Sequence, residues 1–270
     1  AGSCGSVLQK QIHMKSCGKK LCEEYMGKHP VISISLKGIN AASYEAAFEL
    51  TVKTIKGAVQ KAGFLKMSDK LDEDEKKEYR AILDENMSEA TLFWSLKNLS
   101  ELLEKHYETK VILLIDEYDV PLAKAFENGY YDKMVFLIRN LLEQTLKTNN
   151  SLKFAVMTGC MRISKESIFT GLNNLKVLSI TDERFDEYFG FTDEDVKEML
   201  RYYDREDHYE EMRNWYDGYR FGSTDVYCPW DVLNHCDKIK ENAAAFPENY
   251  WVHTSSNEAV KKIIQMSGNI

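Results

Sequence analysis

The hydrophobic positions along the chain fall into short apolar runs separated by longer segments with helical periodicity. Residues 30–36, 111–115 and 152–157 are mostly apolar, and 177–180 is a shorter run of the same kind. Runs of this length are typical of strands that are buried on both faces of a parallel sheet. The pattern therefore predicts four strands.

The segments between these runs predict helices. Apolar residues recur three and four positions apart in 41–64, 88–106 and 130–148, and Ser88 is a candidate N-cap. The charge-rich stretch 68–85 is typical of a solvated helical face. Strands that alternate with such helices predict an α/β fold, with a parallel sheet, helices on both faces and right-handed crossovers.

Three regions follow from the change in pattern along the chain. Residues 1–29 form an N-terminal segment whose first six residues look like an expression remnant. Residues 30–185 contain the alternating strands and helices, and 186–270 predict a small helical subdomain rich in aromatic residues. In the string WYDGYRFG (215–222), packing of the aromatic rings is favoured over stacking on nucleic-acid bases, and Trp230 and Trp251 are expected to be core anchors.

Two adjacent carboxylates, Asp116 and Glu117, directly follow the apolar run at 111–115. The carboxyl ends of parallel strands are where such sheets bind ligands. P-loop nucleotide hydrolases need two acidic groups there, one for Mg²⁺ and one to polarise the attacking water. The alternative is a buried strand that ends in solvated acids. Asp119 is expected to be a solvated charge.

The phosphate-binding half of such a site is not found in the sequence. A P-loop ends in Gly-Lys-Ser or Gly-Lys-Thr, and the nearest strings are Gly18-Lys19-Lys20 and Gly27-Lys28-His29. Neither has the hydroxyl residue, and neither follows an apolar strand.

Composition excludes several classes of protein. The chain has 44% hydrophobic and 29% charged residues, and its net charge of −8 argues against a broad nucleic-acid surface. The apolar runs are too short to span a membrane. Six scattered cysteines and six dispersed histidines predict reduced, cytoplasmic thiols and no zinc framework.

Several long strings occur in a fixed order: IDEYDVPLAKAFENGYYDKM (115–134), FAVMTGCMRISKESIFTGLNNLKVLSI (154–180), YFGFTDEDV (188–196), WYDGYRFG (215–222), CPWDVLN (228–234) and YWVHTSSN (250–257). Together they resemble the bacterial AAA-ATPase-like family of predicted P-loop ATPases, which are often fused downstream to a PD-(D/E)XK nuclease-type domain. The resemblance covers the chain from about residue 12 onward and implies an incomplete P-loop NTPase-like fold.

The resemblance also implies roles for individual residues. Asp116 would be the Walker B residue that holds Mg²⁺, Glu117 the base that polarises water, and Thr158 a sensor of the γ-phosphate or the attacking water. Arg162 and Lys165 would meet nucleotide phosphate or a neighbouring subunit. A solvated or ion-pairing role for Arg162 and Lys165 is weighed equally.

For the family, the resemblance implies ATP and Mg²⁺ as ligands and ATP hydrolysis as the reaction. This chain resembles the middle of such a protein, without the Walker A loop, and is expected to be unable to bind nucleotide alone. A non-catalytic scaffold and a metal-dependent hydrolase using Asp116, Glu117 and Asp119 are the alternatives. Possible partners are further copies of the chain or a downstream nuclease-type domain. A segment such as 6–13, or a partner chain, is expected to fill the place of the central P-loop strand.

Overall fold

The computed structural model describes residues 19–84, 86–160 and 175–250. The chain divides into two compact units: Glu23–Leu175 forms one, and the described residues from Lys176 onward belong to the other. The domain limits predicted at residues 30 and 186 stay predictions. Arg162, Lys165, Trp251 and the segment 6–13 lie outside the described residues.

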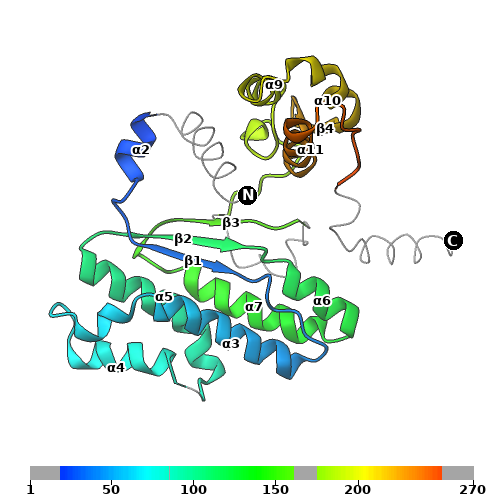
Figure 1. The fold of residues 1–270 in the computed structure, drawn as a ribbon. Helices are drawn as coiled ribbons and strands as arrows, with labels where there is room; N and C mark the ends of the chain where they lie inside the picture. Colours follow the sequence, from blue (N-terminus) through cyan, green and yellow to red (C-terminus); the bar gives the residue numbers. More distant parts are fainter. Residues whose placement is uncertain (1–18, 85, 161–174, 251–270) are drawn as a thin grey trace. The chain divides into compact units, whose positions relative to one another are not determined.

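The first unit contains a parallel sheet of three described strands, β1 (Val31–Ser35), β2 (Val111–Asp116) and β3 (Leu152–Met157). The strand order is β1-β2-β3, so that β2 pairs with a parallel neighbour on each side (Figure 1). The α/β class and these three strands are confirmed.

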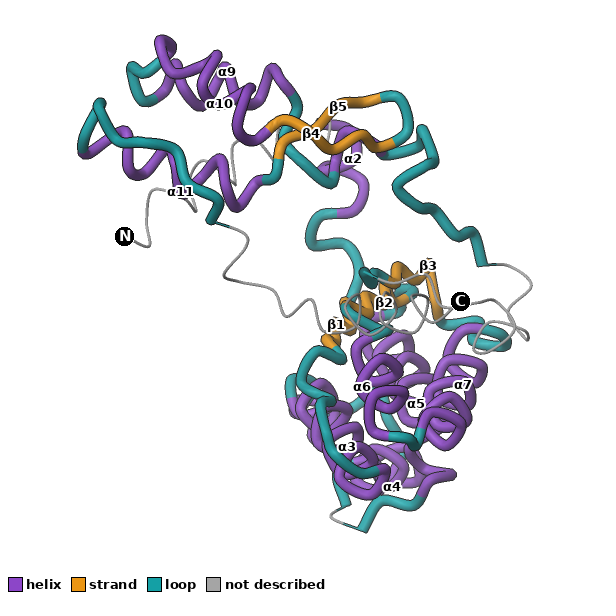
Figure 2. Tube along the Cα trace, turned by 90° about the vertical axis from the view of Figure 1, so that its right-hand side faces the viewer, coloured by secondary structure: helices purple, strands orange, loops and turns teal. Residues whose placement is uncertain are grey.

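The long helices of this unit pack on one face of the sheet (Figures 1 and 2). Their bounds agree with the helical periodicity to within a few residues, and Ser88 accepts a hydrogen bond from the Thr91 amide as the predicted N-cap. The boundary between the units falls inside α2 (Lys19–Tyr25), of which only the last residues belong to this unit. The other described helices of this unit, in chain order, are α3 (Tyr44–Gln60), η1 (Gly63–Met67), α4 (Glu73–Ile82), α5 (Glu89–Tyr107), α6 (Val120–Asn128) and α7 (Tyr131–Leu146).

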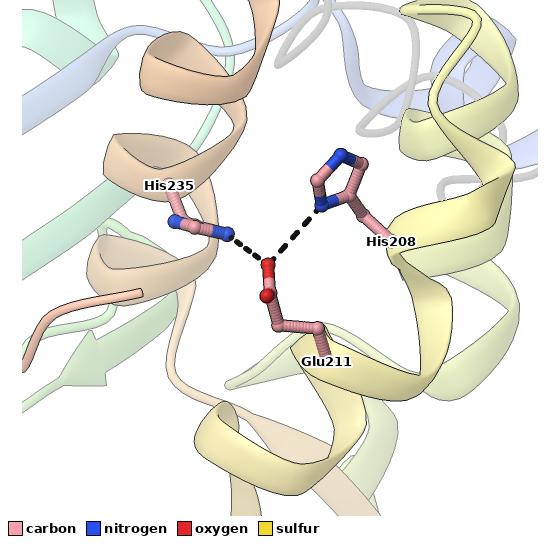
Figure 3. A group of neighbouring side chains, drawn as sticks. All are labelled: His208, Glu211 and His235. Carbon is pink, nitrogen blue, oxygen red and sulfur yellow. Dashed lines mark hydrogen bonds and ion pairs between the residues drawn. The ribbon is translucent and has the colours of Figure 1, made fainter. Parts of the chain in front are cut away.

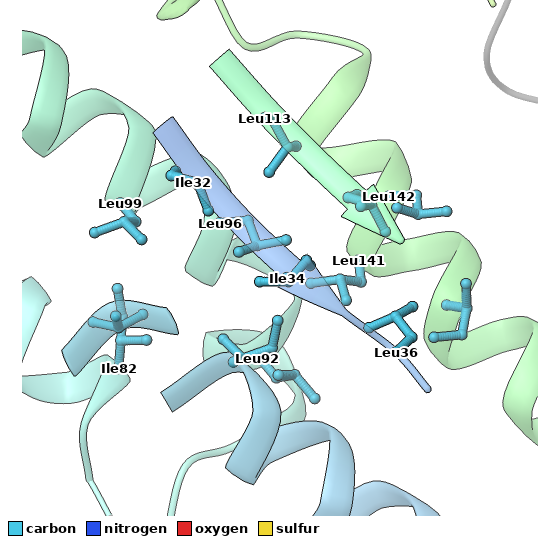
Figure 4. Close-up of a cluster of buried hydrophobic side chains, with 14 of the residues drawn as sticks. Ile32, Ile34, Leu36, Ile82, Leu92, Leu96, Leu99, Leu113, Leu141 and Leu142 are labelled. Carbon is cyan, nitrogen blue, oxygen red and sulfur yellow. The ribbon is translucent and has the colours of Figure 1, made fainter. Parts of the chain in front are cut away.

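The core of this unit lies between the sheet and these helices (Figure 4). Alternate residues of β1 and β2 point into it, because successive side chains of a strand point to opposite faces. Leucines three and four positions apart on the helices fill the other side of this layer. Buried members are Ile32, Ile34, Leu36, Ile82, Leu92, Leu96, Leu99, Leu113, Leu141 and Leu142.

The opposite face of the sheet differs from the prediction. Its apolar side chains Val31, Leu114, Phe154 and Val156 are exposed, and the described helices do not cover them. Tyr25 of α2 makes an edge contact with Phe154, with ring centroids 6.0 Å apart. Helices on both faces are therefore not seen within the described residues. An apolar run shows that both faces of a strand are hydrophobic, but it does not show what covers each face.

The predicted strand at 177–180 is wrong. This segment is irregular, Leu178 and Ile180 are exposed, and the carbonyl of Ile180 accepts a hydrogen bond of 2.8 Å from the Gly222 amide. A short apolar run forms a strand only where a neighbouring strand can pair with it. Here the run, which itself belongs to the second unit, contacts a turn of that same unit instead.

The second unit combines helices with a β-hairpin. Its core contains Val196, Met199, Met212, Tyr216, Val232 and Cys236. The hairpin was not predicted, because its strands are short and polar. The elements are η2 (Asp186–Tyr188), α9 (Asp193–Tyr202), η3 (Glu206–His208), α10 (Tyr209–Tyr216), β4 (Asp217–Phe221), β5 (Thr224–Tyr227) and α11 (Pro229–Glu241).

The aromatic residues of WYDGYRFG divide between core and surface. Tyr216 is buried as predicted, whereas Trp215 and Tyr219 are about half exposed. Trp230 is also exposed, so the core role predicted for these three residues is wrong. The reason is that α10 and α11 each bury one side only and β4 has no buried residue. Sequence spacing across these elements does not show which rings lie on the buried side. None of the described helices has the length and apolar character needed to cross a membrane.

Candidate functional site

The carboxyl ends of β1, β2 and β3 meet at one edge of the sheet. The Thr158 hydroxyl, directly after β3, donates a hydrogen bond of 2.5 Å to Asp116 Oδ1 at the end of β2. The Leu36 amide donates to the Asp116 carbonyl at 2.9 Å, and the Tyr118 amide donates to the Thr158 carbonyl at 3.2 Å. These bonds place the start of all three loops against one another.

Glu117 has an unusual backbone and an unusual carboxylate. Its φ of +53° lies in the left-handed region, which non-glycine residues rarely adopt and which is enriched at functional sites. Its Oε1 lies 3.6 Å from Lys37 Nζ. Its Oε2 is buried and has no hydrogen-bond partner among the described residues. A buried carboxylate oxygen without a partner destabilises the folded state unless a ligand or water donates a hydrogen bond to it.

Asp119 is buried, with 3% of its surface exposed. The prediction that it is a solvated charge is therefore wrong: Asp119 is the N-cap residue of α6 and lies against Gly159 in the loop after β3. A Cβ atom at Gly159 would lie 2.6 Å from Asp119 Oδ1 and 2.8 Å from the Tyr118 ring. Only glycine fits at position 159 without displacement of these side chains.

The electrostatic field of this site is negative. Burial and then the carboxylates of Asp119, Glu117 and Asp116 raise the pKa of the Cys160 thiol, and Lys37 acts in the opposite direction. A concentration of negative charge at the carboxyl edge of a parallel sheet favours a cation there.

The structure brings together Asp116, Glu117 and Thr158, three of the residues singled out from the sequence. It adds Lys37 and Gly159, which were not among the predicted site residues. Within the residues that the structure describes, the ligand atoms of Asp116, Glu117 and Asp119 do not converge as a three-residue metal group. The geometry therefore does not favour a hydrolase in which these three carboxylates hold one metal ion.

Comparison with known proteins gives one family match. The family model described as "AAA-ATPase_like: Predicted AAA-ATPase" matches residues 10–169. An "Uncharacterized protein in vnfD 5'region" of Azotobacter chroococcum mcd 1 is 33% identical over 137 residues. That alignment covers 46% of this chain and 24% of the relative, so the chain spans about a quarter of the relative's length. No solved structure matches.

Proposed function

The chain belongs to the AAA-ATPase-like family of predicted ATPases, and from this premise we propose that the unit Glu23–Leu175 supplies the magnesium- and water-handling half of an ATP-hydrolysing site. Its residues are Asp116, Glu117 and Thr158.

Two observations support this proposal most strongly: Thr158 pairs with Asp116, and Oε2 of the next residue, Glu117, is buried without a partner among the described residues. The three side chains come from the ends of adjacent parallel strands. A polar side chain after the strand next to Asp116 is where a sensor of the γ-phosphate is expected in this class of site.

The donor set fits magnesium, which prefers carboxylate, hydroxyl and water oxygens. Asp116 is exposed at the edge of the sheet and offers its carboxylate. The next residue, Glu117, offers its unpartnered Oε2. Bound Mg²⁺ would neutralise charge on the phosphate oxygens of ATP.

The chain's own residues have separate tasks in this proposal. Glu117 accepts a hydrogen bond from the attacking water and orients it, since positioning is most of what phosphoryl transfer requires. Thr158 holds the Asp116 carboxylate in one orientation through its hydroxyl.

We also propose that the chain alone binds MgATP weakly. Its 270 residues contain no Gly-Lys-Ser or Gly-Lys-Thr string, and a cluster of carboxylates repels the triphosphate unless a cradle of amides and a lysine offsets it. Lys37 is the described cation nearest to Glu117, and one exposed lysine does not replace that cradle.

Titration calorimetry of MgATP tests both parts, with wild type, Asp116→Asn and Glu117→Gln in parallel. We expect a Kd of about 1 mM or weaker in wild type, or no measurable heat. Binding of about 10 µM or tighter that is lost in Asp116→Asn would overturn the second part and support the first. Tight binding that is the same in all three proteins would overturn the assignment of the site. A second titration uses Mg²⁺ alone. No binding of MgATP, together with heats of Mg²⁺ binding that are the same in wild type and Asp116→Asn, would favour the non-catalytic scaffold.

A further inference from the structure

Two histidines and a glutamate converge in the second unit (Figure 3). His208 ends η3, Glu211 follows on α10, and His235 comes from α11. His208 Nδ1 lies 3.1 Å from Glu211 Oε1, and His235 Nε2 lies 2.9 Å from the same oxygen. The three ligand atoms all lie within 4.8 Å of one another.

The positions of the three side chains are set by the packing of α10 and α11. His235 is fully buried, next to Cys236 of the core. The side chain of His208 is 12% exposed and that of Glu211 is 34% exposed. Two ligands are thus fixed by burial, and the third leaves the site open to solvent on one side.

The outer nitrogen of one ring has an oxygen at hydrogen-bond distance: His235 Nδ1 lies 3.4 Å from the Tyr250 hydroxyl. Histidines that bind metals usually donate their second N–H to such an oxygen, which orients the ring and raises its basicity. His208 Nε2 lies 3.9 Å from Asp207 Oδ2, beyond hydrogen-bond distance.

We propose that His208, Glu211 and His235 form a binding site for a divalent transition metal, with Zn²⁺ as the best match. Two imidazole nitrogens and one carboxylate oxygen are a donor set that suits Zn²⁺ and is poor for Mg²⁺. Three protein ligands leave a fourth position for water or an external ligand.

The competing interpretation is a hydrogen-bonded cluster in which Glu211 accepts two N–H bonds. In that cluster both rings lie within hydrogen-bond distance of one carboxylate oxygen of Glu211. Titration with a metal ion distinguishes the two interpretations.

Titration with Co²⁺, followed by visible absorption, tests the site because Co²⁺ substitutes for Zn²⁺ and reports its coordination. We expect the d–d bands of a four-coordinate site without a thiolate charge-transfer band, since no cysteine ligand is proposed. Zn²⁺ should displace the Co²⁺. The proteins to compare are wild type, His208→Gln, Glu211→Gln and the control Glu210→Gln, which removes an exposed carboxylate next to the site.

The affinity for Co²⁺ should fall by about 100-fold or more in His208→Gln and Glu211→Gln and stay unchanged in Glu210→Gln. His208 is chosen because it is not fully buried, and far-ultraviolet circular dichroism checks the fold of each variant. Absence of four-coordinate bands in wild type, a spectrum with thiolate bands, or equal affinity in His208→Gln and wild type would each overturn the proposal.

Discussion

Thr158 and Asp116 are 42 residues apart in sequence, and the hydroxyl of the first donates a hydrogen bond of 2.5 Å to the carboxylate of the second. This bond joins the ends of two adjacent strands and sets the orientation of the proposed magnesium ligand. The orientation of the Asp116 carboxylate therefore depends on the Thr158 hydroxyl.

Replacement of Thr158 by valine should destabilise the first unit by about 0.5–1.5 kcal/mol, because a hydrogen bond to a partly solvated carboxylate is lost. Thr158→Ser retains the hydroxyl and serves as the control. Chemical denaturation measures the difference. Equal stability of the valine and wild-type proteins would contradict the role given to this bond.

Leu113 and Leu114 provide a matched pair on β2, since the first is fully buried and the second is 37% exposed on the opposite face. Leu113→Ala should cost about 2–5 kcal/mol through lost burial and the cavity that remains. Leu114→Ala should cost about 1 kcal/mol or less. Similar losses for both variants, measured by denaturation, would mean that the second face is covered in solution.

Cys160 should report a cation at the carboxyl edge. Burial and the neighbouring carboxylates raise the pKa of its thiol, so alkylation near neutral pH should be slower than for a free cysteine. Bound Mg²⁺ would offset the negative charge, lower the thiol pKa and accelerate alkylation. Peptide mapping after timed alkylation follows this one cysteine among six. An acceleration that persists in Asp116→Asn would show that the cation acts elsewhere.

Asp193 should make the second unit sensitive to acid. Burial raises the pKa of Asp193, but hydrogen bonds from Lys197, Tyr209 and Tyr227 outweigh burial and lower it. A lowered carboxyl pKa contributes stability above the ordinary value of about 3.9. That contribution is lost as the pH falls through the lowered value.

Wild type should therefore unfold less readily than Asp193→Asn at neutral pH, and the difference should shrink below about pH 3.9. Denaturation curves across this range measure it, and Glu194→Gln, at an exposed neighbour, is the control. A difference that grows toward acid would contradict the assignment.

The apolar runs predicted β1, β2 and β3, and the spacing of apolar residues predicted the long helices between them. Both are possible because the buried side of a strand or helix repeats at short range in the sequence, every two or every 3.6 residues. Asp116 and Glu117 were predicted on the same basis, as the first polar residues after a buried strand. Thr158 depended on family resemblance, since a threonine after a strand is not distinctive by itself.

Features that depend on contacts distant in sequence were not predicted. The burial of Asp119 was not predicted, because it involves the close approach of Gly159, 40 residues further along the chain. The convergence of His208 and Glu211 with His235 depends on how α10 packs against α11. The exposed apolar face of the sheet was not predicted, because hydrophobic side chains do not specify what covers them.

The central claim, a magnesium site at Asp116, is tested most directly by titration of isotopically labelled protein with Mn²⁺, which replaces Mg²⁺ on oxygen ligands and broadens nearby resonances. We predict broadening of the Glu117, Thr158 and Gly159 amide signals in wild type and its loss in Asp116→Asn. Broadening of these signals that is equal in both proteins, or no broadening at this edge of the sheet, would contradict the account.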